Sequence, residues 1–233
     1  MVDFHSHILP QIDDGSQSVD ESRQMLETLA AQRVDTVCLT PHFYANRRTP
    51  EAFLERRQAA LERLQPILTA EMPRVRLGAE VLYFRGITHM AELPRLRLEG
   101  TRLLLLEMPF AAWSEGEVRE VIDLCHDSEF VVLLAHVERY MKYQKPDVWD
   151  RLLEEGAMMQ SNASFLLPLL SRRKAVRMIR GGRIHVLGTD CHNMTTRSPN
   201  MDKAVQVLYK HLGRSDTARF FARGEDYLEE WSL

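Results

Sequence analysis

The chain opens with Met1-Val2-Asp3-Phe4-His5-Ser6-His7, a short apolar stretch that ends in two histidines. Side chains at positions i and i+2 of an extended strand point to the same side. We therefore expect His5 and His7 to project together from the end of a first strand, where two imidazoles can hold a metal ion. A hydrogen-bonded histidine beside a solvated one gives the same pattern, and the motif alone does not separate these interpretations.

Further along the chain, short apolar runs alternate with segments of helical period. After the first strand, the expected strands are residues 36–40, 75–80, 103–107, 130–136, 157–162 and 184–189. The expected helices are residues 18–33, 50–70, 115–128, 146–155, 166–180, 203–212 and 216–223. Buried strands joined by helices are typical of an α/β fold with a parallel sheet, and about seven such units approach the number that closes a barrel.

The composition is that of an ordinary globular chain, which we interpret as one domain over residues 1–233. Apolar residues make up 45% and charged residues 27%, and the net charge is -3 without a strongly basic block. This balance argues against nucleic acid or an anionic membrane as a partner. Neither a signal peptide nor a membrane-spanning helix is expected. Three widely spaced cysteines, Cys38, Cys125 and Cys191, do not form a disulfide framework and predict a cytoplasmic location.

Residue types that bind metals follow one expected strand after another. After His5 and His7 come Asp14, His42, Glu80, Glu107, His136, Asp190 and His192. In parallel barrels the carboxyl ends of the strands meet on one face, where the active site is built. One carboxylate after an apolar run is weak support for a site. Six strand ends that all finish in His, Asp or Glu are hard to explain by solvation, because Lys, Ser and Asn would serve as well.

This set of side chains contains five histidines and four carboxylates and no thiolate. Nitrogen and oxygen ligands suit manganese, iron or zinc and argue against copper(I) or an iron–sulfur cluster. The set exceeds what one ion can use. It predicts two or three divalent ions bridged by a carboxylate.

Six motifs in the chain resemble the polymerase-and-histidinol-phosphatase (PHP) superfamily. They are His5-Ser6-His7, Asp13-Asp14-Gly15, Thr40-Pro41-His42, Gly78-Ala79-Glu80, Ala135-His136-Val137-Glu138-Arg139-Tyr140 and Thr189-Asp190-Cys191-His192-Asn193. The resemblance runs in order from Met1 to about Met201. It is closest to the bacterial protein-tyrosine phosphatase branch of capsule and exopolysaccharide synthesis. It implies a distorted (β/α)7 barrel with a metal cluster, usually manganese-activated, at the carboxyl ends of the strands.

The resemblance also implies the substrate and the roles of individual residues. The substrate would be phosphotyrosine on the tail of a bacterial tyrosine autokinase. One ion would be surrounded by His5, His7, Glu80 and Asp190, with Glu80 as the bridge, and the others by His42, Glu107, His136 and Asp14 with His192. Arg139 and Arg197 match arginines that hold the substrate phosphate, and Asp14 and His42 are the candidates for general acid catalysis. The alternative for Arg139 is a surface ion pair with Glu138 or a neighbour.

The chain departs from the family pattern in places, and this leaves its substrate partner open. Valine follows His136 where proline is frequent, threonine precedes Asp190 where serine is common, and residues 214–233 match less well. A small-molecule phosphomonoesterase, such as a histidinol phosphatase, is the alternative within metal hydrolysis. A non-catalytic metal-binding module is the alternative outside catalysis.

Cys191 and Arg197 have the Cys-x5-Arg spacing of thiol-dependent tyrosine phosphatases. That chemistry needs a thiolate and a loop of free backbone amides, which glycine usually permits, and this loop contains no glycine. Four aromatic residues, Tyr83, Phe84, Phe110 and Trp113, are expected either at the mouth of the site or in ordinary packing. The remaining histidines, His89, His126, His185 and His211, are interpreted as structural or surface residues.

Overall fold

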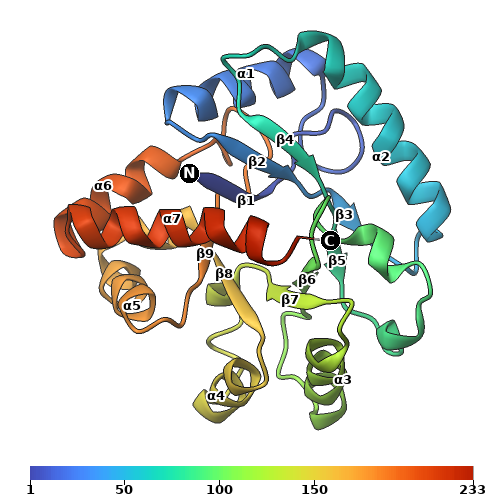
Figure 1. Ribbon diagram of the computed structural model, residues 1–233, viewed down its shortest axis with the longest axis vertical. Helices are drawn as coiled ribbons and strands as arrows, with labels where there is room; N and C mark the ends of the chain where they lie inside the picture. The colour runs from blue at the N-terminus through green and yellow to red at the C-terminus, as the bar shows by residue number, and fades with distance from the viewer. Residues whose placement is uncertain (233) are drawn as a thin grey trace.

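The computed structural model describes residues 1–232 and shows parallel strands that curl into a barrel with helices outside it (Figure 1). The strands are β1 Val2–Ser6, β2 Thr36–Leu39, β3 His42–Phe43, β4 Arg74–Leu77, β5 Glu80–Leu82, β6 Leu103–Glu107, β7 Val131–Leu134, β8 Met158–Asn162 and β9 Val186–Gly188. The helices are α1 Val19–Ala31, α2 Pro50–Leu64, α3 Glu115–His126, α4 Pro146–Glu154, α5 Leu169–Arg180, α6 Met201–His211 and α7 Arg214–Glu230.

The strands form two sheets, and the chain runs directly from one sheet into the other at two places. One sheet has the order β1-β2-β4 and the other the order β3-β5-β6-β7-β8-β9. β3 continues the direction of β2, and β5 that of β4. The nine strands therefore occupy seven positions around the barrel, which we call staves. The His5 carbonyl accepts from Asp190 N (2.8 Å), and His7 N donates to the Cys191 carbonyl (2.9 Å). These bonds join β1 to the segment after β9, so the predicted α/β barrel class is confirmed.

The chain is interrupted after β2 and after β4, and the second interruption divides the predicted strand 75–80. Pro41, which has no N–H to donate, separates β2 from β3. Gly78 separates β4 from β5, and a Cβ at Gly78 would lie 2.5 Å from Leu98 Cδ2. Glu80 consequently opens β5 instead of ending the predicted strand 75–80. The prediction for 130–136 is also too long, because β7 ends at Leu134 and His136 lies in the following turn.

Three of the predicted helices have clearly different bounds. α2 ends at Leu64 and is followed by a 3-10 turn at Gln65–Ile67, so the predicted helix 50–70 is too long. α5 begins only at Leu169, after a 3-10 turn at Ala163–Leu166 and the N-cap residue Pro168. α7 runs to Glu230, well beyond the expected end at residue 223. Its Gly224 lies within the helix and faces Phe4 of β1, whose Cε2 would lie 3.4 Å from an ideal Cβ, an ordinary packing distance.

The interior of the barrel is filled at the end where the strands begin. Val2, Phe4, Leu103 and Val186 belong to one buried cluster, against which α7 packs its Leu228. Figure 1 shows α7 crossing in front of β1 and β9, and the Trp231 carbonyl accepts from Arg102 N just before β6. The carboxyl ends of the strands therefore carry the polar site. Within residues 1–232, no helix is long and apolar enough to cross a membrane.

Candidate metal centre

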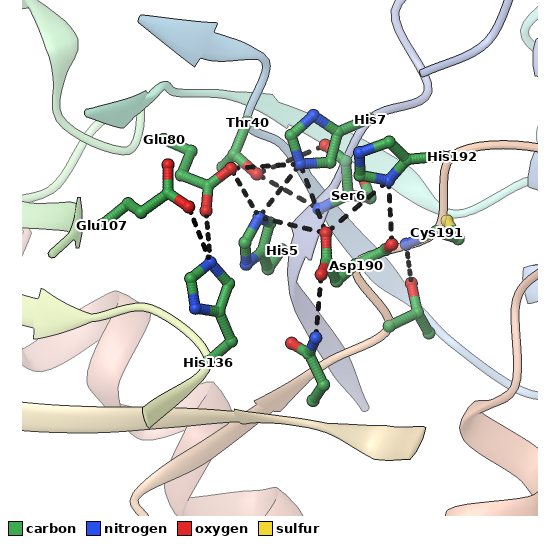
Figure 2. Close-up of polar contacts among 12 residues, drawn as sticks. His5, Ser6, His7, Thr40, Glu80, Glu107, His136, Asp190, Cys191 and His192 are labelled. Atoms are coloured by element: carbon green, nitrogen blue, oxygen red, sulfur yellow. Dashed lines mark hydrogen bonds and ion pairs between the residues drawn. The ribbon is translucent and has the colours of Figure 1, made fainter. Parts of the chain in front are cut away.

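Glu80, at the start of β5, lies at the centre of the candidate site (Figure 2). Its Oε2 atom is 2.8 Å from His42 Nδ1, 3.2 Å from His5 Nε2 and 3.3 Å from His7 Nε2. Its Oε1 atom is 2.7 Å from His136 Nε2. One buried carboxylate thus faces four imidazoles from three different staves, which is the arrangement expected of a bridging ligand.

Asp190 forms the second focus of the cluster, directly after β9. Its Oδ1 atom is 3.4 Å from His7 Nε2, 3.6 Å from His5 Nε2 and 3.6 Å from His192 Nδ1. The other carboxylate oxygen, Oδ2, is turned away from these rings and accepts from Asn162 Nδ2 at 2.8 Å. The two oxygens of Asp190 therefore serve different neighbours.

Glu107 and Asp14 are the two remaining carboxylates of the cluster. Glu107, the last residue of β6, places Oε1 3.5 Å from His136 Nε2 and Oε2 3.9 Å from His42 Nδ1. Asp14 Oδ1 lies 3.5 Å from His42 Nε2 and 3.7 Å from His192 Nε2, and its side chain is 67% exposed. All nine side chains that the sequence predicted as ligands therefore lie in one connected cluster.

Within this cluster, three groups of donor atoms lie close enough together to hold a cation. They are His5, His7 and Asp190; then His42, Glu80 and Glu107; and then His7, Asp14, His42 and His192. His136 is outside these groups but contacts Glu80. The groups share His7 and His42, so their ligands cannot be divided among three fully independent sites.

The buried polar atoms fit a bound divalent cation. Glu80 Oε2, His42 Nδ1 and His192 Nε2 are buried and lack a hydrogen-bond partner of good geometry among the described residues. Burial opposes charge on Glu80 and Asp190, but the surrounding imidazoles, His5 foremost, hold the pKa of both carboxyls well below the usual range. Ionised carboxylates and unpaired imidazole nitrogens are the donors that a divalent transition metal takes.

Two ligand candidates have a left-handed backbone. His136 has a φ of 31° and Asp190 a φ of 52°. This region is uncommon for residues with a side chain and is tolerated where surrounding contacts enforce it. His136 N donates to Gln160 Oε1 (2.6 Å) and Asp190 N donates to the His5 carbonyl (2.8 Å). These bonds hold both turns so that the side chains reach Glu80 and His7.

Two glycines make room for the paired histidines of β1. A Cβ at Gly188 would lie 2.5 Å from His5 Cβ, and a Cβ at Gly15 would lie 2.2 Å from the His7 carbonyl oxygen. Such separations do not occur without displacement of the backbone. Gly15 of the Asp13-Asp14-Gly15 motif is therefore required by close packing against His7.

Asp13 orients His7 from behind the cluster, a role that the sequence analysis did not assign. Its Oδ2 atom lies 2.8 Å from His7 Nδ1 and accepts from His42 N at 3.0 Å. Its Oδ1 atom accepts from Gly15 N at 2.9 Å. Although burial opposes ionisation, His7 lowers the pKa of Asp13 below its usual range. A carboxylate behind a histidine fixes the ring and its tautomer and makes it a better ligand.

Gln160 and Asn162 of β8 form a second group of residues behind the ligands, and the sequence analysis did not predict it. Gln160 Oε1 lies 3.2 Å from His5 Nδ1, and Gln160 Nε2 donates to Asn162 Oδ1 at 3.1 Å. Asn162 in turn donates to Asp190. Gln160 and Asn162 are two positions apart and so share one side of the strand. This spacing is visible in the sequence. It does not by itself predict a role, because amide side chains are common and their partners are known only from the structure.

The two predicted phosphate-binding arginines lie at the rim of the cluster. Arg139 Nη2 and Arg197 Nη2 both contact Asp190 Oδ2, the latter at 2.7 Å. Their side chains are 35% and 37% exposed. Arg139 is ion-paired with Asp190, and Glu138 instead accepts from Ser161 Oγ. Because a guanidinium has five N–H donors, each arginine keeps donors free toward the mouth of the site.

The Cys-x5-Arg segment lacks the features of a thiol-dependent site. Cys191 is completely buried, and burial raises the pKa of its thiol well above the ordinary value. Asn193 Oδ1 accepts from the backbone N–H groups of Thr195, Thr196 and Arg197 at 2.8–3.1 Å. The amides that would surround a phosphate in such an enzyme are therefore already bonded within the loop.

The predicted aromatic residues divide between packing and the mouth of the site. Tyr83 and Trp113 are mostly buried and packed in the core, and Phe84 is half-buried against it. Phe110 is 49% exposed and stacks on the His136 ring, with centroids 5.9 Å apart. Tyr44, which the sequence analysis overlooked, stacks on the His42 ring at 5.1 Å.

Comparisons with known proteins agree with this arrangement. A family model described as capsular polysaccharide synthesis, CpsB/CapC, matches residues 1–228. Tyrosine-protein phosphatase YwqE of Bacillus subtilis is 28% identical over 226 residues, which cover 91% of this chain and 85% of the relative. Tyrosine-protein phosphatase CpsB of Streptococcus pneumoniae is 25% identical over 237 residues, with 95% of each chain covered.

Solved structures share the same fold. A chain from the crystal structures of YwqE and CpsB, described as unique metal-dependent tyrosine phosphatases, superposes with a TM-score of 0.84 at 24% identity. The match covers 100% of this chain and 96% of the other. A chain of an archaeal ribonuclease P structure superposes with a TM-score of 0.60 at 10% identity, covering 98% and 90%. At these identities the likeness concerns the fold alone.

Proposed function

Because the chain belongs to the CpsB/CapC family of capsular polysaccharide synthesis, we propose that it is a metal-dependent protein-tyrosine phosphatase. The observation that carries the proposal is the convergence of nine predicted ligands around Glu80 and Asp190. The relatives that match over nearly the whole chain are named tyrosine-protein phosphatases. The proposed substrate is phosphotyrosine on a bacterial tyrosine autokinase that controls capsule or exopolysaccharide synthesis.

The proposed cofactor is a group of two or three divalent ions, with manganese first and iron or zinc as alternatives. His5, His7, Glu80 and Asp190 would hold one ion, and the other predicted ligands, His42, Glu107, His136, Asp14 and His192, would hold the rest. Bound ions supply a water whose pKa falls from ~15.7 to about 7 and positive charge for the phosphoryl oxygens. Asp13 and Gln160 support the proposal, because they orient His7 and His5 toward the cluster.

Arg139 and Arg197 are proposed to bind the substrate phosphate. Their shared contact with Asp190 Oδ2 holds both guanidiniums on one side of the cluster. Planar guanidinium groups match two phosphate oxygens at once, so the pair would orient the phosphoryl group and stabilise charge on its equatorial oxygens.

The aromatic rings at the mouth suit a phenyl phosphate. Tyr44 lies on His42 and Phe110 on His136, and both histidines contact Glu80. A substrate tyrosine ring is proposed to pack on these side chains. Its phenolate leaving group has a conjugate acid pKa of about 10 and needs less protonation than an alkoxide. Asp14 and His42 remain the predicted groups for any proton transfer.

A cytoplasmic location is proposed because Cys38, Cys125 and Cys191 are all free thiols. Disulfides persist in oxidising compartments, and thiols without partners are typical of reducing ones.

The test is hydrolysis of a phosphotyrosine peptide by purified protein before and after chelation, with manganese, zinc and magnesium then added back separately. We expect activity to disappear with the chelator and to return with metal, most with manganese. Activity that survives complete metal removal would refute the metal mechanism. Faster turnover of histidinol phosphate would favour the small-molecule phosphatase, and metal binding without any turnover would favour the non-catalytic module.

A further inference from the structure

A pocket of about 400 Å³ opens beside the metal centre, on the side of β3. It is lined by residues 12–14 of the acidic turn, by His42, and by Tyr44, Arg47 and Arg48 of the segment after β3. We call it the arginine pocket. Because Asp14 and His42 belong both to its lining and to the predicted ligand set, the pocket is continuous with the metal centre.

The segment after β3 is fixed in a turn that presents its arginines. Arg47 N and Arg48 N donate to the Tyr44 carbonyl at 2.9 and 3.2 Å. The Arg47 guanidinium lies 4.7 Å from the centre of the Tyr44 ring, and that ring stacks on His42. A cation–π contact of this kind positions the guanidinium without consuming its N–H donors. Arg47 is thus connected to the metal centre through one aromatic ring.

The positive charge continues along α2. Arg56 Nη2 donates to the Ile12 carbonyl (3.3 Å), and Arg63 donates to the Pro10 carbonyl and to Gln11 Oε1 (2.7 Å each). Together with partial burial, the charges of Arg48 and Arg63 lower the pKa of Arg56, as expected for neighbouring guanidiniums. In the part of the chain that the structure describes, none of Arg47, Arg48, Arg56 and Arg63 has a carboxylate oxygen within 4.0 Å.

These guanidiniums stand out by their position beside the metal centre, since arginines elsewhere on the described surface, such as Arg74, also lack a carboxylate partner. The chain has a net charge of -3, and arginines such as Arg23 and Arg151 pair with carboxylates. The pocket lining also contains two carboxylates: Asp13, which is paired with His7, and Asp14, which faces His42 and His192 and is a predicted metal ligand. Unpaired guanidiniums beside a phosphate-binding site are available to a second anionic group of the same substrate.

We propose that the arginine pocket is a subsite for an anionic side chain that flanks the phosphotyrosine, a carboxylate or a second phosphate group. This inference rests on the proposed phosphatase function and specifies its substrate further. Arg47 and Arg48 make the direct contacts, and Arg56 adds charge from α2. The pocket therefore selects phosphotyrosines in acidic or multiply phosphorylated segments.

The test compares three peptides that differ only beside the phosphotyrosine, where they carry glutamate, glutamine or phosphoserine. We measure kcat/KM at low ionic strength for wild type, Arg47→Gln, Arg48→Gln and the conservative lysine variants. Arg74→Gln is the matched control, because Arg74 is exposed at the start of β4, at the opposite end of the barrel. The ratio between the charged and neutral peptides cancels any general loss of activity.

We expect wild type and Arg74→Gln to prefer the glutamate peptide over the glutamine peptide about fivefold, since exposed charge pairs are worth up to ~1 kcal/mol each. Each glutamine variant should reduce the preference to twofold or less, mainly through KM, and lysine should restore most of it. A larger preference for phosphoserine would assign the subsite to phosphate. Equal rates on all peptides, or a preference that persists in both Arg47→Gln and Arg48→Gln, would overturn the inference.

Failure of the proposed function gives a different result. The same ratios are measured as binding, by fluorescence anisotropy of peptides with a non-hydrolysable phosphonate in place of phosphotyrosine. A protein that binds the acidic peptide more tightly through Arg47 and Arg48, yet hydrolyses none, refutes the phosphatase function and keeps the subsite. A phosphatase without the binding preference refutes only the subsite.

Discussion

Replacement of Asp13 by asparagine tests whether the metal centre depends on residues behind its ligands. Asp13 is not among the predicted ligands, and its side chain bonds to His7, His42 N and Gly15 N. The substitution keeps the size of the side chain and removes one acceptor and one negative charge. A change in metal affinity therefore reports on the orientation and basicity of His7, together with the loss of one negative charge near the cluster.

The magnitude follows from the hydrogen bonds. Asp13 Oδ2 accepts from two donors, at 2.8 and 3.0 Å, and Oδ1 accepts from Gly15 N at 2.9 Å. An asparagine amide has one oxygen, so its NH2 group must face at least one of these donors. Loss of a bond to a charged acceptor costs about 1.5–3 kcal/mol. Loss of the partner behind a metal-bound histidine lowers metal affinity about 10- to 100-fold.

The assay is manganese titration of the metal-free protein, combined with metal analysis after dialysis and with phosphotyrosine peptide turnover. Asp123→Asn is the control, because Asp123 is an exposed carboxylate on α3. We expect Asp13→Asn to bind manganese 10- to 100-fold more weakly and to regain turnover at high manganese. A folded Asp13→Asn protein with the manganese affinity of wild type would refute the reasoning.

Three further predictions concern the centre and its surroundings. Glu80→Gln should retain fewer ions per chain by metal analysis and lose more than about 100-fold in kcat, because it removes the carboxylate shared by four imidazoles. Cys191→Ser should keep turnover within a few-fold, because the buried thiol takes no part in the reaction. His185→Asn should reduce acid sensitivity of folding. Burial lowers the pKa of His185 to about 4, and its Nδ1 accepts from Met159 N at 3.0 Å.

Stability should fall with decreasing pH because His185 is neutral in the folded protein. The folded pKa lies below the unfolded value of about 6.5, so its contribution is complete above that pH and is lost as pH falls toward 4. At pH 5 the loss is about 2 kcal/mol. Urea unfolding at pH 7.5 and pH 5 should show a loss of stability that is about 2 kcal/mol larger in wild type than in His185→Asn, whose amide oxygen still accepts from Met159. Equal pH slopes in the two proteins would contradict the prediction.

Contrary outcomes are equally clear for the other two variants. Full metal content in Glu80→Gln would show that Glu80 does not bridge ions. Complete loss of turnover in Cys191→Ser with its metal retained would bring thiol chemistry back into consideration.

The ligand cluster could be predicted because its members are rare residue types at strand ends, and parallel strands bring their carboxyl ends together. His42, Glu80 and His136 converge from separate staves although the strand bounds around them were imprecise. Glu80 was predicted at the end of a strand and is found at the start of β5. Its side chain lies in the cluster in both cases.

The supporting residues could not be found in this way. Asp13, Gln160 and Tyr44 act through pairings across the barrel, and each is a residue type that occurs throughout any globular chain. The length of α7 was missed for a related reason. Gly224 has low helix propensity, but its contact with Phe4 is made by an element more than two hundred positions earlier in the chain.

The closure of β1 against the segment after β9 has a consequence for folding during synthesis on the ribosome. Asp3 and Thr189, which bond each other across this seam, are 186 positions apart. His5 and His7 leave the ribosome first, whereas Asp190 and His192 emerge only when most of the chain has been synthesised. A nascent chain therefore lacks Asp190 and His192 for most of its translation, so the group of His5, His7 and Asp190 stays incomplete until then. We therefore expect the group that contains Asp190 to bind its ion only after the last stave has docked.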